Sequence, residues 1–406
     1  MRDIRHLLFI CLLTLGTPIA IAQQYAFNSE EETIEGWYHS HDIQTWTTKG
    51  GDIDVIMEVL DKVERSAGTK RFPELVDTQI EFGPGNWSYE WIQAGDRARS
   101  ETNSLNGYAR LQKLRAALAY YSTGSWPHLG RKDDTQALNK AIETYMAAGA
   151  LMNTPVAHID IPVGEQGAIK VKGYLHLPAG PGPFAMVINS FGSDVTKEDS
   201  FDLFHRELEP RGIGMLAVDM PGIGEAKQLS MADGSDVVME AALKLLREAN
   251  YADQANIFIV GGSFGGNAAA RAFYRLEVAG VVSMCAPLHT AFQYPPDTLD
   301  GLPKLTIDGV KSRFGLLDRS TAALSAPLSE VSLIKQGYMQ ADKTIDTPLF
   351  VITTNRDPVS PLEDLAIFLD SASNQEVIVL DMEGHCPPRG VREPVVARWI
   401  ADKTRN

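Results

Sequence analysis

The fold of this chain is decided by the stretch Asn256-Ile-Phe-Ile-Val-Gly-Gly-Ser263-Phe-Gly-Gly-Asn-Ala-Ala-Ala-Arg271. Its β-branched and aromatic residues predict a strand, and the small residues after Gly-x-Ser-x-Gly predict a helix, with the serine on the turn between them. Glycines are needed at 261 and 265 because a side chain there would collide with the neighbouring strand or helix. The helix directs its free N–H groups at the same place. We therefore interpret Ser263 as a nucleophile, rather than as a chance serine in a glycine-rich turn.

Other short apolar runs flank this stretch along the chain. The expected strands are 157–163, 170–177, 184–189, 213–218, 256–260, 279–284, 348–353 and 376–380. The first two alternate like antiparallel strands, and the others are mostly separated by helical segments. This order predicts an α/β fold with a mainly parallel sheet of about eight strands and helices on both faces. The active site is expected at the carboxyl ends of the strands.

A serine hydroxyl needs a base to take its proton and an acid to orient that base. Behind such a turn the partners are expected in the order Ser, Asp or Glu, His, each on a loop after a later strand. Asp357 follows the strand at 348–353, and His385 follows the strand at 376–380, shortly before the final helix. Asp357 and His385 are therefore the predicted acid and base.

Other acids and histidines are placed less well for these roles. Asp381 is more typical of a strand end, and Asp370 of a helix surface. The competing histidines lie after the next strand, inside a helix, or before the nucleophile: His289, His205, His128, His158 and His176. We give none of them the role of the base.

A tetrahedral intermediate needs two backbone donors for its negatively charged oxygen. One is expected to be the N–H of Phe264, directly after the nucleophile. The other is expected in the loop after the third strand, where Gly192 lets the backbone come close; Ser193 is the first choice and Phe191 the second. Asp194 in the same loop is interpreted as the cap of the next helix.

The N-terminus has the features of a secretory signal peptide over residues 1–22. Arg2 and Arg5 precede an apolar run, and an Ala-x-Ala sequence closes the segment. The run is short and is broken by Gly16 and Pro18, so an uncleaved membrane anchor is the less favoured interpretation. We predict an exported protein, periplasmic or secreted, with no membrane span in the mature chain.

Charge and cysteine usage exclude some classes of partner. The chain has 406 residues and a formal net charge of −15, which suits neither nucleic acid nor an anionic membrane. No Cys and His cluster has zinc spacing, so we expect neither a metal nor an organic cofactor. Cys285 and Cys386 would remain in the mature chain. Export would permit a disulfide between them, but two unrelated thiols are the favoured expectation.

The part of the chain before the sheet is helical and rich in tryptophan. Helical spacing is clear at 52–60 and 106–121, and 135–150 is a third candidate helix. We predict that residues 23–154 form a helical N-terminal cap segment and that residues 155–406 form the catalytic domain, with an insertion at 287–347 beside the site. The tryptophans are expected mainly to pack, although such a segment could also wall the substrate pocket. They are Trp37, Trp46, Trp87, Trp91 and Trp126.

Several motifs together resemble the α/β-hydrolase superfamily over roughly residues 155–401. They are the serine turn, the Asp-x-Pro-Gly-x-Gly turn from Asp219, the Asn-Arg-Asp-Pro-Val loop around Asp357 and the late Gly-His. We interpret each residue of the turn from Asp219 to Glu225 as turn chemistry alone.

The helical segment and the stretch Phe191-Gly-Ser-Asp-Val-Thr-Lys-Glu198 resemble a narrower esterase group within that superfamily. It contains the fermentation–respiration switch protein and the dihydroxypseudooxynicotine hydrolase. The resemblance implies a serine esterase core with a helical cap, active on small carboxylic esters or, in some relatives, on carbon–carbon bonds next to a ketone. The chain departs from the group in having Phe191 where a histidine is usual, and in its signal peptide, which a cytoplasmic switch protein would not need.

We therefore predict a serine hydrolase that cleaves a small-molecule ester through an acyl-enzyme. Ser263 would attack the carbonyl, His385 would relay the proton and Asp357 would orient the imidazole. The alternatives are carbon–carbon or amide hydrolysis with the same residues, or a catalytically inactive binding protein on a hydrolase fold. The oligomeric state is open, and a homodimer is kept as an option.

Overall fold

The computed structural model describes residues 22–23, 34–340 and 344–404. The predicted signal peptide therefore lies outside the described residues, apart from Ala22. Among the helices that the structure describes, none is long and apolar enough to cross a membrane.

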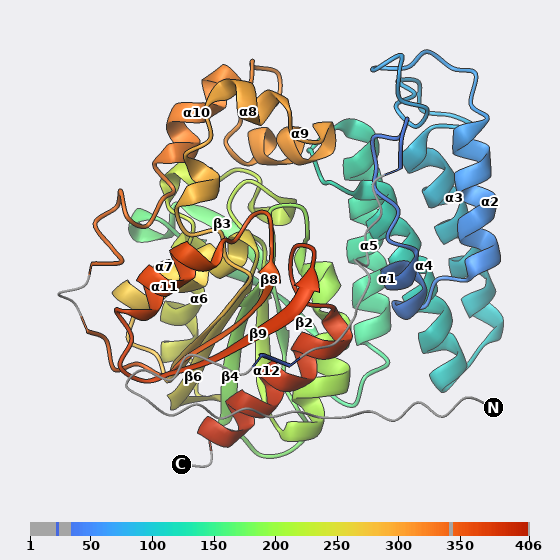
Figure 1. Cartoon of the computed structure of the whole chain (residues 1–406). Coiled ribbons are helices and arrows are strands. Elements are labelled where there is room, and N and C mark those ends of the chain that lie inside the picture. Colours follow the sequence, from blue (N-terminus) through green and yellow to red (C-terminus); the bar gives the residue numbers. More distant parts are fainter. Residues whose placement is uncertain (1–21, 24–33, 341–343, 405–406) are drawn as a thin grey trace, which may run out of the picture.

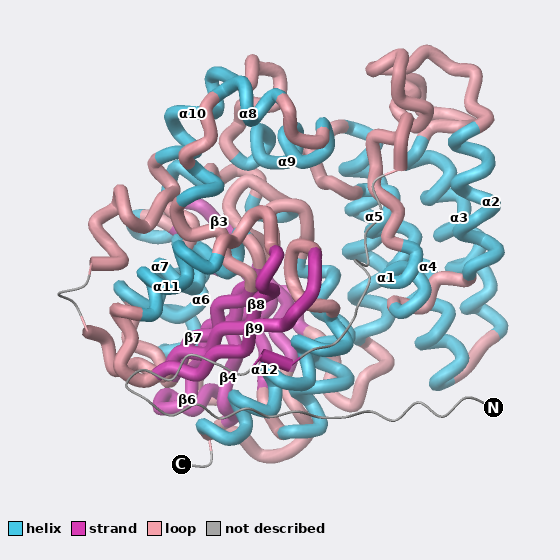
Figure 2. Tube along the Cα trace, viewed as in Figure 1, coloured by secondary structure: helices cyan, strands magenta, loops and turns pink. Residues whose placement is uncertain are grey.

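A mostly parallel sheet forms the centre of the molecule (Figures 1 and 2). In the described part of the chain it has nine strands in the order β1-β9-β8-β7-β6-β4-β5-β3-β2. The strands are β1 Ala22–Gln23, β2 Ala157–Val163, β3 Ile169–His176, β4 Phe184–Ser190, β5 Gly214–Val218, β6 Ala252–Gly262, β7 Gly280–Met284, β8 Leu349–Arg356 and β9 Gln375–Glu383. Among the strand pairs of this sheet that the structure describes, β2–β3 and β3–β5 are antiparallel and the others are parallel. The predicted fold class is confirmed, with the two-residue β1 added at one edge.

Helices cover both faces of the sheet because its strands are apolar on both sides. In β4, Met186 and Ile188 face one core, whereas Val187 between them faces the other. The helices of the catalytic core are α6 Val237–Glu248, α7 Phe264–Arg275, α11 Leu362–Leu369 and α12 Arg389–Lys403. The first three pack in one core and α12 packs in the other. This layering leaves the carboxyl ends of the parallel strands open at one edge.

The N-terminal helices stand beside the sheet (Figure 1). They are α1 Ile43–Thr48, α2 Ile53–Glu64, α3 Trp87–Glu101, α4 Gly107–Ser125 and α5 Lys132–Gly149. Close approach of α3 and α4 needs small residues, since a Cβ on Gly124 would lie 2.8 Å from the Cβ of Trp91. Trp91 has no exposed surface and Trp87 is buried, so these two tryptophans pack as expected.

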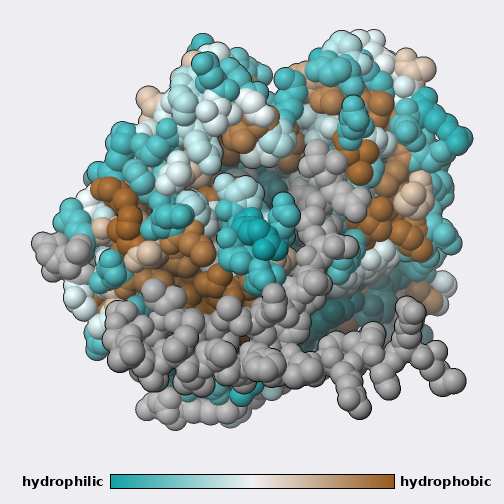
Figure 3. Space-filling view, viewed as in Figure 1, coloured by the Kyte–Doolittle hydropathy of each residue, from teal (hydrophilic) through white to brown (hydrophobic). Residues whose placement is uncertain are grey.

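Three further helices lie between β7 and β8, over the carboxyl edge of the sheet. They are α8 Pro296–Asp300, α9 Lys304–Arg313 and α10 Ala322–Ser329. The surface is hollowed between these helices and the N-terminal helices (Figure 3). This hollow lies above the ends of the parallel strands, where the predicted site residues are found.

Candidate active site

Ser263 lies on the turn between β6 and α7, in a strained backbone conformation with φ 56° and ψ −124°. Non-glycine residues seldom adopt such a positive φ. The glycines around it are required by close contacts: a Cβ on Gly261 would overlap the carbonyl oxygen of Gly265, and one on Gly265 would overlap that of Phe191. The N–H of Ser263 donates to the carbonyl of Met284 in β7 at 2.9 Å. The turn thus holds the hydroxyl clear of the sheet.

The structure brings the three predicted catalytic residues into hydrogen-bonding order. His385 Nε2 lies 2.8 Å from Ser263 Oγ, and His385 Nδ1 lies 2.9 Å from each carboxylate oxygen of Asp357. The Asp357 carboxylate also accepts the N–H groups of Val359 at 2.8 Å and Ser360 at 3.0 Å. Its side chain is fully buried, which fixes the carboxylate behind the imidazole. This arrangement can activate a serine hydroxyl by proton transfer.

The rival acids and histidines lie elsewhere. Asp381 accepts from Arg356 at 2.8 Å on the rim, and Asp370 caps the end of α11. Each rival histidine bonds a different neighbour: His128 bonds Ser125, His158 bonds Glu225, His176 bonds Tyr145, His205 bonds Glu209 and His289 bonds Ser332.

The two cysteines of the catalytic region form a disulfide, so the expectation of unrelated thiols is wrong. Cys285 and Cys386 are separated by 101 residues, and their Cα atoms lie 5.1 Å apart. Cys285 follows β7, and Cys386 lies in the loop after β9. These two strands flank β8 and run parallel to it, so both loops come to the same edge of the sheet. Ser360 Oγ donates to the Cys285 carbonyl at 2.6 Å, which joins the acid loop to the same cluster. The bonded sulfurs are not thiolates, so their proximity to His385 does not make a metal site.

The loop of residues 191–194 lies against Ser263 and is called the oxyanion loop below, after the role predicted for Ser193. A Cβ on Gly192 would be 3.4 Å from Ser263 Oγ. Phe264 is the first residue of α7, so its N–H has no acceptor within the helix. The predicted donors Phe264 and Ser193 therefore lie on the two segments that border the serine, and Phe191 belongs to the same loop.

Asp194 does not cap a helix, so that expectation is wrong. The next helical turn begins after Thr196 and has no side-chain cap. Asp194 Oδ2 instead accepts the indole N–H of Trp126 at 3.2 Å. The carboxylate thus connects the oxyanion loop to the N-terminal segment.

A cavity of about 1780 Å³ opens in front of Ser263. Its walls come from the N-terminal segment, the oxyanion loop, the helices between β7 and β8, and the His385 loop. Aromatic and aliphatic side chains supply much of the lining, including Trp37, Trp126, Phe292, Tyr294, Leu302 and Ile307. Trp37 and Trp126 therefore wall the cavity, in contrast to the packed Trp87 and Trp91.

A buried ion network follows the oxyanion loop. Lys197 Nζ lies 2.9 Å from Asp219, 2.7 Å from Glu225 and 3.3 Å from Glu198. Burial alone would lower the pKa of Lys197, but the three carboxylates outweigh it and raise that pKa. Burial raises the pKa of Asp219. The interpretation of Asp219 and Glu225 as turn chemistry alone is therefore wrong, because both bind a buried cation from another segment.

Sequence reasoning missed two contacts of the oxyanion loop. One is the hydrogen bond from the Trp126 indole to Asp194, and the other is the hydrogen bond from Arg313 to the carbonyl of Ser193. Arg313 lies in the insertion, which carries no motif. A signal for the ion network did exist. Asp219 directly follows β5, Lys197 lies in the loop region after β4, and these two strands are neighbours in the sheet.

Comparison with known proteins places this site in context. Residues 13–385 match the family model described as Esterase FrsA-like. The chain is 31% identical over 355 residues to Esterase FrsA of Vibrio cholerae serotype O1, covering 86% of this chain and 84% of the relative. It is 30% identical over 379 residues to Esterase FrsA of Enterobacter sp., covering 92% and 90%.

Solved structures share the fold at lower sequence identity. The crystal structure of the 2,6-dihydroxy-pseudo-oxynicotine hydrolase is similar with a TM-score of 0.68 at 19% identity, covering 88% of this chain and 94% of that one. AbyA5 is similar with a TM-score of 0.63 at 19% identity, covering 80% and 90%. At these identities the likeness supports the fold.

Proposed function

This chain belongs to the FrsA-like esterase family, and on that premise we propose that it is a serine esterase in which Ser263, His385 and Asp357 form the catalytic triad. The observation that carries the proposal is the unbroken chain of contacts from Ser263 Oγ to His385 at 2.8 Å and from His385 to Asp357 at 2.9 Å. The strained conformation of Ser263 supports it, since strain of this kind is concentrated at functional sites.

The reaction proceeds in two halves. Ser263 Oγ attacks the ester carbonyl while His385 Nε2 takes its proton, and Asp357 stabilises the imidazolium. The N–H groups of Phe264 and Ser193 hold the tetrahedral oxygen. His385 then protonates the departing alcohol and leaves an acyl-Ser263. In the second half His385 Nε2 takes a proton from water as the water oxygen attacks the acyl carbonyl. His385 then returns this proton to Ser263 Oγ as the bond between Oγ and the acyl carbon breaks, and the carboxylic acid leaves.

The cavity supports a small-molecule ester as the substrate. Its volume of about 1780 Å³ and its aromatic lining suit a ligand with an apolar body. The N-terminal segment contributes Trp37 and Trp126 to this wall, so we assign it to the substrate pocket.

We also propose that the protein is exported. The disulfide between Cys285 and Cys386 supports this, because disulfides persist in oxidising compartments and are rare in the cytosol. Mass spectrometry of the mature protein would show a chain that begins near Gln23. A full-length chain recovered from the cytoplasm would contradict export.

The test of the esterase proposal is hydrolysis of p-nitrophenyl esters from acetate to octanoate. Ser263→Ala and His385→Ala are expected to lower kcat by roughly 10⁴-fold to 10⁶-fold, because triad members act as a unit. His289→Ala is the matched control, since this loop histidine bonds Ser332 away from the triad. A serine-directed fluorophosphonate should label the wild type and not Ser263→Ala. Equal labelling of both proteins would remove Ser263 from the nucleophile's role.

A further inference from the structure

Arg313 is the last residue of α9, and its side chain lies in the protein interior at 1% exposure. A guanidinium presents five N–H donors in a rigid planar fork. Buried cations are normally paired with carboxylates, because desolvation of the charge is otherwise uncompensated. The hydrogen-bond partners of Arg313 are of another kind, and they point to its role.

Backbone carbonyl oxygens from three segments accept most of the hydrogen bonds of Arg313, and the hydroxyl of the adjacent Ser312 accepts one more from Nη1 at 3.1 Å. Nε donates to Ser193 in the oxyanion loop. Nη1 donates to His128 at 2.8 Å and to Gly222 at 3.3 Å. Nη2 donates to Pro127 at 2.5 Å. Burial lowers the pKa of Arg313 to about 10, so the group keeps its charge at neutral pH.

The bond to Ser193 acts directly on the loop that borders the nucleophile. The held carbonyl oxygen fixes the planar peptide that follows Ser193, and so restricts rotation about the Cα–C bond of Ser193. The N–H that we assign to the oxyanion hole belongs to the same residue. Arg313 itself does not line the cavity, so it reaches the site only through this backbone contact.

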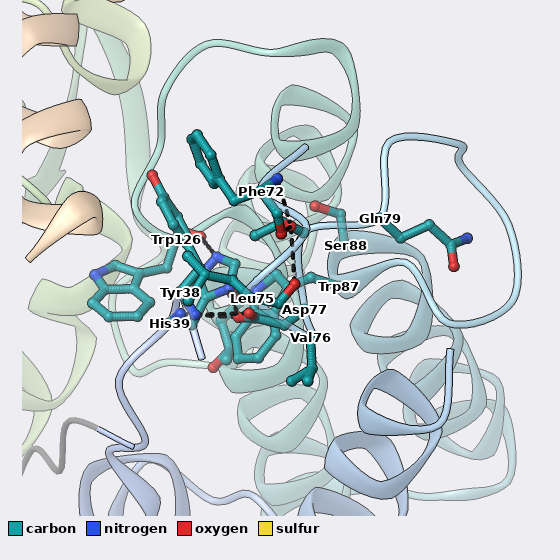
Figure 4. Close-up of polar contacts among 12 residues, drawn as sticks. Tyr38, His39, Phe72, Leu75, Val76, Asp77, Gln79, Trp87, Ser88 and Trp126 are labelled. Carbon is teal, nitrogen blue, oxygen red and sulfur yellow. Dashed lines mark hydrogen bonds and ion pairs between the residues drawn. The ribbon is translucent and has the colours of Figure 1, made fainter. Parts of the chain in front are cut away.

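A second bond holds the same loop one residue later. The indole N–H of Trp126 donates to Asp194 at 3.2 Å. Trp126 is held in turn, since its carbonyl lies 3.1 Å from His39 Nε2, and His39 Nδ1 lies 2.6 Å from Asp77. The His39 ring also stacks on Trp87 with centroids 3.8 Å apart. In Figure 4 the backbone of Trp126 faces His39, and its indole ring extends away from Asp77.

We propose that Arg313 is a positioning residue of the esterase site, which holds the oxyanion loop at Ser193 while Trp126 holds it at Asp194. The inference rests on the proposed function, because it assigns the loop to the binding of the tetrahedral oxygen. Donors that are fixed in advance stabilise that oxygen without reorganisation during the reaction. The insertion and the N-terminal segment thus contribute to the chemistry as well as to the cavity wall.

The experiment compares Arg313→Lys and Arg313→Gln with the wild type on a short p-nitrophenyl ester. Lysine keeps the charge but lacks the fork, so both variants are expected to lower kcat by about 10-fold to 100-fold, with KM changed by less than about 3-fold. The inhibition constant of an alkyl boronate, which forms a tetrahedral adduct with the serine, should rise in parallel with the loss of kcat. Arg319→Gln, at an exposed arginine of the same insertion, is the control that should change neither quantity.

The inference is overturned if folded Arg313→Lys and Arg313→Gln keep kcat and boronate affinity, even if both are less stable. If neither variant folds, Trp126→Phe decides the question, because it removes the N–H that Asp194 accepts. The ratio of the boronate inhibition constant to KM should then rise by about 3-fold to 10-fold, and an unchanged ratio overturns the inference. A wild type that turns over no ester and resists the fluorophosphonate would overturn the proposed function, and this inference with it.

Discussion

Two buried cations lie next to the oxyanion loop, and their partners differ in kind. Lys197 is surrounded by the carboxylates of Glu198, Asp219 and Glu225. Arg313 is held by the backbone carbonyls of three segments. The ammonium group of Lys197 binds carboxylates and so joins two loops of the core. The planar guanidinium of Arg313 binds backbone carbonyls and so fixes the positions of those backbone segments. The same formal charge therefore stabilises the fold at one position and orients a loop at the other.

Removing the charge at Lys197 is expected to have the largest effect on stability. Lys197→Met leaves buried carboxylates without their cation, which should lower the free energy of unfolding by about 3–5 kcal/mol. Lys172→Met is the control, because its pair with Asp160 is largely solvated and is expected to contribute little to stability. Urea unfolding at pH 7 measures both. Equal, small losses in the two variants would show that the buried network contributes no more than a surface pair.

Two glycines of one turn separate the two cation sites. A Cβ on Gly222 would lie 2.5 Å from the carbonyl oxygen of Arg313, whereas one on Gly224 would overlap the carboxylate of Asp219. Both glycines have a positive φ, of 84° and 56°, so either alanine variant should lose about 1–3 kcal/mol of stability. Only Gly222→Ala is expected to lower kcat, by about 10-fold, since it displaces Arg313. Equal kcat values in the two variants would erase the distinction between the sites.

The stabilisation that Glu225 contributes to the Lys197 network is expected to be lost at low pH. Burial pushes its pKa up, but the hydrogen bond to His158 and the charge of Lys197 outweigh this and lower the pKa to about 2. Because the folded pKa lies below the unfolded one, the stabilisation is complete above the usual pKa of 4.5 and is lost as pH falls towards 2. With screening at this partly exposed group, Glu225→Gln should lose about 1–2 kcal/mol at pH 7. The difference from wild type in thermal unfolding should shrink as pH is lowered from 5 to about 3, and a constant difference would contradict the linkage.

The pKa of Asp134, near the Arg313 site, is shifted in the opposite direction from that of Glu225. Burial raises its pKa to about 7, and its charge acts on Arg313 only from a distance. Because the folded pKa is above the unfolded one, this acid destabilises the fold increasingly as pH rises from about 4 to 7. Asp134→Asn should therefore raise stability by about 1 kcal/mol at pH 8 and leave it unchanged at pH 4. A variant that is less stable at pH 8 would mean that the ionised carboxylate has a favourable partner.

The catalytic core could be predicted because its signals are local. Short apolar runs mark the strands, and Gly-x-Ser-x-Gly marks the turn that exposes Ser263. Asp357 and His385 each follow a later strand, and parallel strands place such residues at one edge whatever lies between them. Chain order alone was therefore enough to select the three residues that the structure brings together.

The contacts of the buried polar groups could not be predicted in the same way. Cys285 and Cys386 are separated by 101 residues, and nothing local distinguishes a bridged cysteine from a free thiol. Asp194 precedes a helical turn, which suggested a helix cap. In the structure its carboxylate instead accepts a hydrogen bond from the Trp126 indole, which belongs to the N-terminal segment. The turn from Asp219 has the composition of any glycine-rich turn, so its role in binding Lys197 could not be predicted from the sequence.

The sequence by itself determined the fold class, the strained turn at Ser263 and the placement of Asp357 and His385 after later strands, because strand, turn and helix preferences act between neighbours along the chain. Only the tertiary structure decided which segments support the site. Arg313 contacts Pro127 and Ser193, which lie 186 and 120 residues away. Such contacts depend on how the insertion and the N-terminal helices pack over the sheet, and no periodicity in the sequence encodes that packing.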